Sequence, residues 1–330
     1  MDHVIEVEHL RKSYGETVAV ADLSFSVARG EIFGFLGRNG AGKTTSVECV
    51  QGLRRPDGGD LRVLDLDPQR QTQELRRRIG CQLQESALPD RMRVWEALDL
   101  FSSLVPGKRD WRRLLEEWGL GDKAKASFGS LSGGQRQRLL VALALVNDPE
   151  IVFLDEMTTG LDPAGRRVAW ELVRTIRDRG ATVVLVTHFM DEAEELCDRV
   201  AVVDQGRVVA VDSPQGLIAG RGGVVRLRFS APDGDLAWLG DVAHVQSVVR
   251  RGSQIEVRGD GPVVVLVAAA LVEHGIVPAD LRVNQPTLED VFLAMTGGAG
   301  PGEVGAQSGE VGAGSGATGE EGPPGAVAGG

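Results

Sequence analysis

A glycine-rich turn near the N-terminus carries the groups needed to hold a chain of phosphates. It follows an apolar run, precedes a helical pattern and matches a phosphate-binding loop. Glycines let successive backbone N–H groups converge on phosphate oxygens, and the helix dipole favours the same negative charge. The Lys43 ammonium can reach the terminal phosphates, and the Thr44 hydroxyl can ligate Mg²⁺. The residues are Gly37, Arg38, Asn39, Gly40, Ala41, Gly42, Lys43 and Thr44, followed by Thr45.

Two carboxylates follow an apolar run much later in the chain. Residues 151–154 are continuously apolar and lead into Asp155 and Glu156, which is typical of a parallel strand buried on both faces. Asp155 is placed to bind Mg²⁺, usually through water, and Glu156 to orient or deprotonate an attacking water. A strand followed by an acidic turn is the simpler interpretation, but the phosphate loop favours a catalytic pair.

A second candidate phosphate site begins another helical pattern, which continues to Asn147. Here Ser132, Gly133, Gly134 and Gln135 follow Leu131. A serine and exposed backbone N–H groups at a helix start can bind an anion. A plain helix cap needs the serine, but it needs neither the two glycines nor the glutamine.

In this order the motifs resemble those of ATP-binding cassette (ABC) ATPases, over roughly residues 4 to 215. The resemblance implies a glutamine loop at Gln84, an aspartate loop at Asp162 and a switch histidine at His188 that contacts the γ-phosphate. We prefer Gln84 to Gln82 because Gln84-Glu85 resembles the Gln-Glu pair of the family. A lone histidine is usually structural, but the residues around His188 match the switch region of the family.

The resemblance also implies a role for each site residue. Tyr14 falls where the family stacks an aromatic ring on adenine, although an edge-strand tyrosine is the alternative. We expect ATP and Mg²⁺ as cofactors, Lys43, Glu156 and His188 as catalytic residues, and Thr44, Gln84 and Asp155 as Mg²⁺ ligands. The expected ATP-binding residues are Tyr14, residues 37–45, Gln84, Ser132, Gly133, Gly134, Gln135 and Asp162.

Two positions depart from the usual pattern of the family. Arg38 and Met157 stand where the family usually has proline. Neither change removes a ligand or the catalytic base, so we expect ATP binding to persist. Without the proline, Met157 could loosen the backbone that leads to Asp162. Such loosening would affect the rate of ATP hydrolysis and the communication between the two subunits of a dimer.

The composition fits a globular protein that does not attract nucleic acid. The chain has 330 residues, 42% hydrophobic content and a net charge of −11, so its surface as a whole repels anions. Three well-separated cysteines favour a reducing compartment. The N-terminus does not resemble a signal peptide, and the longest apolar stretch, residues 262–272, is shorter than the about 20 residues of a membrane span.

Alternating strand and helix patterns predict an α/β fold. We expect a P-loop NTPase (RecA-like) core with a mostly parallel sheet, an antiparallel β edge subdomain and an inserted helical subdomain at about residues 91–147. This ABC domain should occupy residues 1–220, and a small α+β domain residues 221–297. The glycine-rich composition of residues 298–330 predicts disorder.

The C-terminal part suggests a kind of transporter. Residues 284–297 resemble the end of daunorubicin-resistance-type drug-export ATPases, although a generic amphipathic helix is the alternative. We therefore expect a homodimer of ATP-binding subunits, with ATP at its interface, that serves a separate integral-membrane permease at the cytoplasmic face of the cell membrane. The alternatives are a soluble ABC ATPase acting on nucleic acid or ribosomes, and an importer ATPase.

Overall fold

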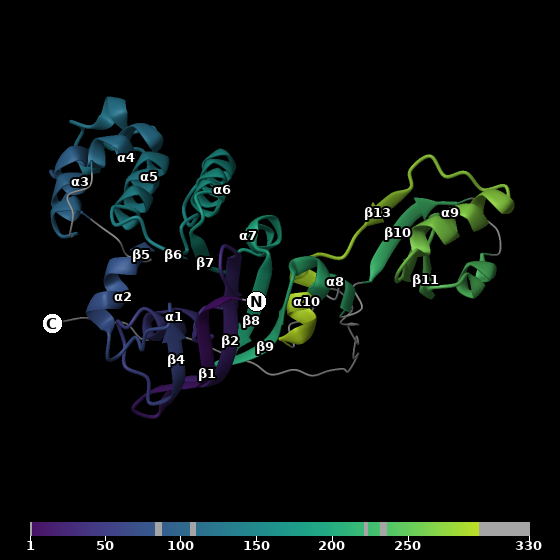
Figure 1. Ribbon diagram of the computed structural model, residues 1–330. Coiled ribbons are helices and arrows are strands. Elements are labelled where there is room, and N and C mark those ends of the chain that lie inside the picture. The colour runs from purple at the N-terminus through teal and green to yellow at the C-terminus, as the bar shows by residue number, and fades with distance from the viewer. Residues whose placement is uncertain (1, 83–87, 106–109, 221–223, 232–235, 297–330) are drawn as a thin grey trace, which may run out of the picture.

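Two β-sheets organise the protein in the computed structural model, which describes residues 2–82, 88–105, 110–220, 224–231 and 236–296. The large unit holds a nine-stranded sheet, and the small unit holds a four-stranded antiparallel sheet (Figure 1). Gln84 and the glycine-rich segment 298–330 lie outside the described residues. The predictions made for them stay predictions.

The large sheet has the order β4-β1-β2-β9-β8-β3-β7-β6-β5. Strands β5, β6, β7, β3 and β8 run parallel, while β1 pairs antiparallel with β2 and β4. This confirms the predicted α/β core with its antiparallel edge. The strands are β1 (His3–Tyr14), β2 (Thr17–Ala28), β3 (Ile32–Leu36), β4 (Gly58–Val63), β5 (Ile79–Gln82), β6 (Ile151–Asp155), β7 (Thr182–Thr187), β8 (Arg199–Asp204) and β9 (Arg207–Asp212).

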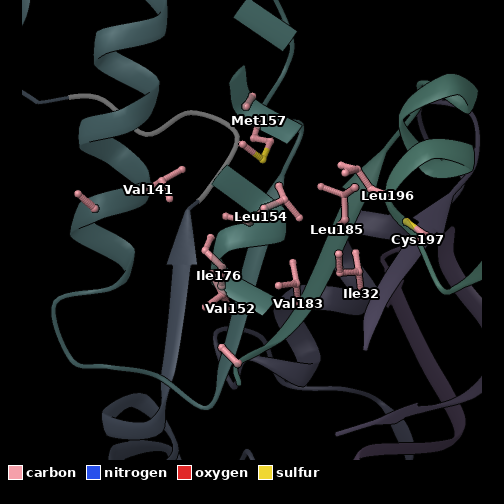
Figure 2. Packing of buried hydrophobic residues seen from close by; sticks show 14 of the residues in the cluster. Ile32, Val141, Val152, Leu154, Met157, Ile176, Val183, Leu185, Leu196 and Cys197 are labelled. Atoms are coloured by element: carbon pink, nitrogen blue, oxygen red, sulfur yellow. The ribbon is translucent and has the colours of Figure 1, made fainter. Parts of the chain in front are cut away.

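Side chains alternate between the two faces of the central strands and fill two cores. Val152 and Leu154 of β6 join the core on one face, next to Val183 and Leu185 of β7 (Figure 2). On the other face Phe153 packs with Phe33, Phe35 and helix α1 (Lys43–Val50). Every residue of β3, β6 and β7 is buried, which explains their continuous apolar sequences.

Helices cover the sheet and form the inserted group between β5 and β6. That group holds α3, α4 and α5 and packs around buried Leu98, Trp118 and Leu139, so the described residues between α3 and β6 are mostly helical. The helices of the large unit are α1 (Lys43–Val50), α2 (Thr72–Arg78), α3 (Val94–Ser103), α4 (Trp111–Glu117), α5 (Gly133–Ala144), α6 (Pro163–Asp178), α7 (Met190–Leu196) and α8 (Pro214–Gly220).

The small unit packs one helix, α9 (Val263–Glu273), on its sheet. Val263, Val267 and Leu271 of α9 are buried, whereas Val265 is exposed, so the apolar stretch forms a helix with one face in the core of the small unit. Within the described ranges, no helix combines the length and apolar character needed to cross a membrane. The strands are β10 (Val225–Ser230), β11 (Val245–Arg251), β12 (Gln254–Gly259) and β13 (Arg282–Asn284).

The last described helix, α10 (Leu288–Met295), returns to the large unit. It contacts α7 and α8, beside which it is drawn in yellow in Figure 1. Leu288, Val291 and Phe292 are buried in the same core as β6 and β7. The range 221–297 that we expected for the small domain therefore includes a helix whose buried side chains belong to the large core.

Replacing Phe292 with alanine should destabilise the large unit. Phe292 is 3% exposed, and truncating a buried phenylalanine costs about 3–5 kcal/mol of unfolding free energy. Thermal unfolding followed by circular dichroism measures the change. Val277→Ala is the control, because Val277 is 79% exposed and should tolerate the change. Equal melting temperatures for Phe292→Ala and wild type would show that α10 does not pack here in solution.

Candidate ATP-binding site

The phosphate loop joins β3 to α1, at the carboxyl end of a central strand. Gly42 occupies the N-cap of α1 with a φ of 98°, a conformation that glycine adopts without strain. A Cβ atom at this position would lie 2.3 Å from the carbonyl oxygen of Ala19. Only glycine therefore fits here, and the loop presents its backbone and the first turn of a helix to a ligand.

Lys43 lies buried within the loop that it serves. Its Nζ donates to the carbonyl oxygens of Gly37, at 2.7 Å, and Arg38, at 3.0 Å. Burial lowers the pKa of Lys43, while the carboxylates of Glu156 and Asp155 oppose that shift. The loop thus holds the ammonium beside both carboxylates, where phosphate oxygens can take over its contacts with the carbonyl groups.

Asp155 ends β6 directly beside Thr44. The Thr44 hydroxyl donates to Asp155 Oδ2 at 3.5 Å. Burial, and next the charge of Glu156, raise the pKa of Asp155 to about 6. Asp155 Oδ1 is buried without a hydrogen-bond partner among the described residues. A carboxylate oxygen in need of a positive partner, next to a hydroxyl, fits a divalent cation that also binds phosphate and water.

This arrangement holds only part of a metal shell. In the part of the chain that the structure describes, no three His, Cys, Asp or Glu side chains gather as a metal site. Mg²⁺ usually keeps several waters and binds through one or two carboxylates plus substrate phosphates. Asp155 and Thr44 match that mode, so the nucleotide would have to complete the coordination.

Glu156 faces the switch histidine. His188 Nδ1 lies 3.0 Å from Glu156 Oε1, and the Glu156 N–H donates to Val186 O at 2.9 Å. Glu156 has a φ of 47°, a left-handed conformation that costs a residue with a side chain about 1–2 kcal/mol. The neighbouring strand holds this strained turn in place, and the turn directs the carboxylate towards His188 instead of along β6.

The second candidate phosphate site caps α5. Ser132 Oγ accepts from the Gln135 N–H at 3.3 Å, and Gln135 Oε1 accepts from the Ser132 N–H at 3.0 Å. Both residues therefore serve as helix caps in the structure, as the simpler interpretation requires. Helix α5 lies within the helical group, away from α1 (Figure 1), so the chain does not bring this motif to its own phosphate loop.

The remaining predicted residues occupy separate positions. Asp162 is the N-cap of α6 and accepts from the Gly165 N–H at 2.6 Å. Tyr14 is 41% exposed, with the Lys12 ammonium 5.5 Å and the Arg54 guanidinium 5.3 Å from its ring, so the ring is accessible. Gln82, the alternative to Gln84, is buried and accepts from the Gln137 side chain at 3.4 Å.

The two unusual residues differ in their surroundings. Arg38 is exposed. Met157 is 1% exposed and packs in the large core near Leu154 (Figure 2). Its side chain thus contributes apolar packing just after Glu156, at a point where proline would instead restrict the backbone.

Sequence analysis did not place the C-terminal helix at this site. A cavity of ≈ 380 Å³ separates the phosphate loop and the switch histidine from α10. Helix α10 reaches this place because the chain returns to the large unit after the small one. No residue spacing in the sequence reveals that return. The cavity is lined by Gly37, Arg38, Asn39, His188, Met190, Glu289, Phe292 and Leu293.

The sequence of this chain is similar to those of known transport ATPases. The ABC transporter family model matches residues 20–159. The Nod factor export ATP-binding protein I of Paraburkholderia xenovorans is 39% identical over 301 residues, which cover 89% of this chain and 97% of that protein. The daunorubicin resistance ATP-binding protein DrrA3 of Streptomyces coeruleorubidus is 38% identical and is covered over 96% of its length. This chain belongs to the ABC transporter family.

Solved structures agree with this membership. An ATP-binding subunit of an ABC transporter is 26% identical, with a TM-score of 0.59, and the match covers 65% of this chain and 92% of that one. The protein is therefore an ABC ATP-binding subunit, an ATPase that works with a membrane permease. The predicted family, fold class and ATPase activity are confirmed, while the role of each site residue stays a prediction.

Proposed function

We propose that this ABC ATPase drives the export of a drug or another hydrophobic compound through a separate permease. The supporting observation is similarity along nearly the whole chain to the export and resistance proteins described above. Because this similarity extends beyond the ATPase core into the C-terminal part of the chain, it favours an exporter over an importer or a soluble ATPase that acts on nucleic acid. In a vesicle that holds a partner permease, ATP should drive uptake of an exported compound only when this chain is bound, and uptake without this chain would contradict the proposal.

We infer that Mg²⁺ and a second copy of the chain complete the active site. Lys43, Thr44 and Asp155 would hold the phosphates and the metal, which shields the phosphate charge when bound. Ser132 is exposed and caps α5, a helix that is drawn away from α1 and its phosphate loop (Figure 1). A head-to-tail homodimer would place Ser132 over the ATP bound by the partner subunit. Asp162 would face the same interface.

We place the protein at the cytoplasmic face of the cell membrane, held there by the permease. A cytoplasmic helix of the permease would dock beside the glutamine loop. Leu88 and Met92 are half-buried, and both pack against the large core. Trp95 is half-buried too, with its ring 6.4 Å from that of Trp111. The surface that remains suits the apolar side of a short amphipathic helix.

Charged residues at this surface should uncouple the ATPase from its permease. In the double variant Leu88→Glu/Met92→Glu we expect at least about a tenfold loss of permease co-purification, because each buried charge lacks a partner. ATP hydrolysis by the free chain should persist. Leu100→Glu/Leu104→Glu is the matched control, because both leucines are exposed on the same helical group. Normal permease binding by the first variant would place the docking site elsewhere.

A further inference from the structure

A cluster of cationic, aromatic and acidic side chains joins the start of α6 to the start of α7. Arg166 lies in the first turn of α6, where its N–H donates to the Asp162 carbonyl at 2.9 Å. Its Nη2 donates to Asp191 Oδ1 at 2.9 Å. Its guanidinium lies over the Phe189 ring at 4.4 Å and over the Trp170 ring at 5.6 Å. The backbone of Arg166 is therefore bonded to the aspartate loop, and its side chain contacts the segment after the switch histidine.

The Phe189 ring links Arg166 to His188, which in turn contacts the catalytic Glu156. The rings of His188 and Phe189 lie 4.1 Å apart between centroids, and His188 contacts Glu156 at 3.0 Å. Because a guanidinium over an aromatic face is held by both charge and packing, Arg166 restricts where Phe189, and with it His188, can lie. A continuous set of side-chain contacts thus runs from Arg166, one helical turn after Asp162, to the catalytic carboxylate.

Glu192 lies in the first turn of α7, directly after Asp191, and is fully buried. Burial raises its pKa, whereas the hydroxyls of Thr187 and Thr158, the indole N–H of Trp170 and the charge of Arg166 act in the opposite direction. Thr187 directly precedes His188, and Thr158 lies between Glu156 and the aspartate loop. The carboxylate is therefore surrounded by donors from both segments that border the catalytic pair.

The Thr158 hydroxyl and the Trp170 indole lie close enough to the carboxylate to oppose the rise in its pKa that burial causes, but neither reaches full hydrogen-bond geometry with it. Buried polar atoms without partners cost about 1–3 kcal/mol each, so a group of them in one place needs an explanation. A small movement of the α6 start against α7 would bring them together. Among the described residues, the buried atoms without a partner include Glu192 Oε1 and Oε2, Trp170 Nε1, Arg166 Nε and Thr158 Oγ1.

We propose that Arg166 and Glu192 are positioning residues for His188, and that they transmit movement of the Asp162 loop to the catalytic pair. Arg166 holds the His188–Phe189 pair against α6. Glu192 supplies the acceptor that can draw in the donors of both neighbouring segments. The proposal rests on ATP hydrolysis at Glu156, and it requires neither an exported compound nor a permease.

The test compares Arg166→Met with the same change in a His188→Ala background. Methionine keeps the apolar stem of arginine and removes the cation. In the otherwise wild-type chain we expect the kcat for ATP to fall about tenfold, with KM within about twofold, as for a contact that acts in the transition state. In the His188→Ala background the same change should cost almost nothing, because residues that act through one group are not additive.

Arg174→Met is the matched control. Arg174 lies further along α6 and also bridges to α7, through an ion pair with Glu195. Within the described part of the chain its hydrogen bonds go to Glu171 and Glu195, and not to the switch segment. Its loss should leave kcat and KM unchanged. A similar fall in kcat for Arg174→Met, or an additive loss for Arg166→Met with His188→Ala, would overturn the proposal.

Glu192→Gln separates positioning from packing, because glutamine keeps the volume and removes the buried charge. We expect kcat to fall about fivefold while the melting temperature stays equal or rises, since a buried charge without a good partner is destabilising. A fall in both would indicate a packing role instead.

A spectroscopic measurement on the purified full chain does not depend on turnover. The ring nitrogens of His188 can be followed by NMR in protein labelled with ¹⁵N-histidine, with His188→Ala identifying the signal. Arg166→Met and Glu192→Gln should shift that signal, and Arg174→Met should not. An unchanged His188 signal in both test variants would refute the positioning role even if the isolated chain hydrolysed ATP slowly.

Discussion

Glu156→Gln should abolish ATP hydrolysis and leave ATP binding intact. Glutamine keeps the shape of the side chain beside His188 but cannot accept the proton of the attacking water. The expected fall in kcat is about 10²–10⁴-fold, the range that general base catalysis contributes. Phosphate release measures turnover, and a fluorescent ATP analogue measures affinity.

The same variant tests the proposed dimer. Because ATP persists at its site, the nucleotide should bridge Lys43 of one copy and Ser132 of the other. Sedimentation velocity should show a dimer with ATP and a monomer without it. Glu150→Gln is the control, because Glu150 precedes β6 at its other end and pairs with Arg78, so this variant should hydrolyse ATP normally. Near-normal turnover by Glu156→Gln would contradict the catalytic role of Glu156, and a dimer that forms without nucleotide would indicate another interface.

Lys43→Ala should weaken ATP binding and abolish turnover. The ammonium lies within the phosphate loop, 5% exposed, where charge-assisted hydrogen bonds are worth about 1.5–3 kcal/mol each. Loss of one or two such bonds corresponds to at least about a tenfold weaker affinity. Isothermal titration calorimetry with ATP and Mg²⁺ measures this change.

Lys125→Ala provides the control for charge, because Lys125 is exposed in the inserted helical group. It should bind and hydrolyse ATP as the wild type does. If Lys43→Ala bound ATP with unchanged affinity, the loop around Gly42 would not be the phosphate site. The melting temperature of Lys43→Ala should equal that of the wild type. Equal values would show that the weaker ATP binding does not come from unfolding.

The phosphate loop could be predicted from the sequence because its chemistry is local. Its glycines, lysine and threonine are consecutive, and the strand before and the helix after are coded by neighbouring residues. The same holds for Asp155 and Glu156, which end a strand whose burial shows in its apolar run. Short-range backbone geometry decides such motifs, so the tertiary structure had little to add to them.

The long strands at the N-terminus were only partly visible in the sequence. Only residues 4–7 and 23–27 alternate in the sequence as strands do, whereas β1 and β2 each have 12 residues. Register shifts interrupt their pairing, and such irregularities break the alternation that marks a strand in sequence. Their full length is set by pairing partners and not by local propensity.

The sequence by itself determined the family, the α/β core and the residues that bear the chemistry, because each of these is encoded within one segment. Only the tertiary structure decided which segments meet. It turned Glu156 towards His188, returned α10 to the cavity beside Arg38, and placed Arg166 between the aspartate loop and Phe189. These contacts join residues far apart in the chain. They form because apolar faces on separate helices and strands have to be buried against one another, and no local pattern records which faces will pair.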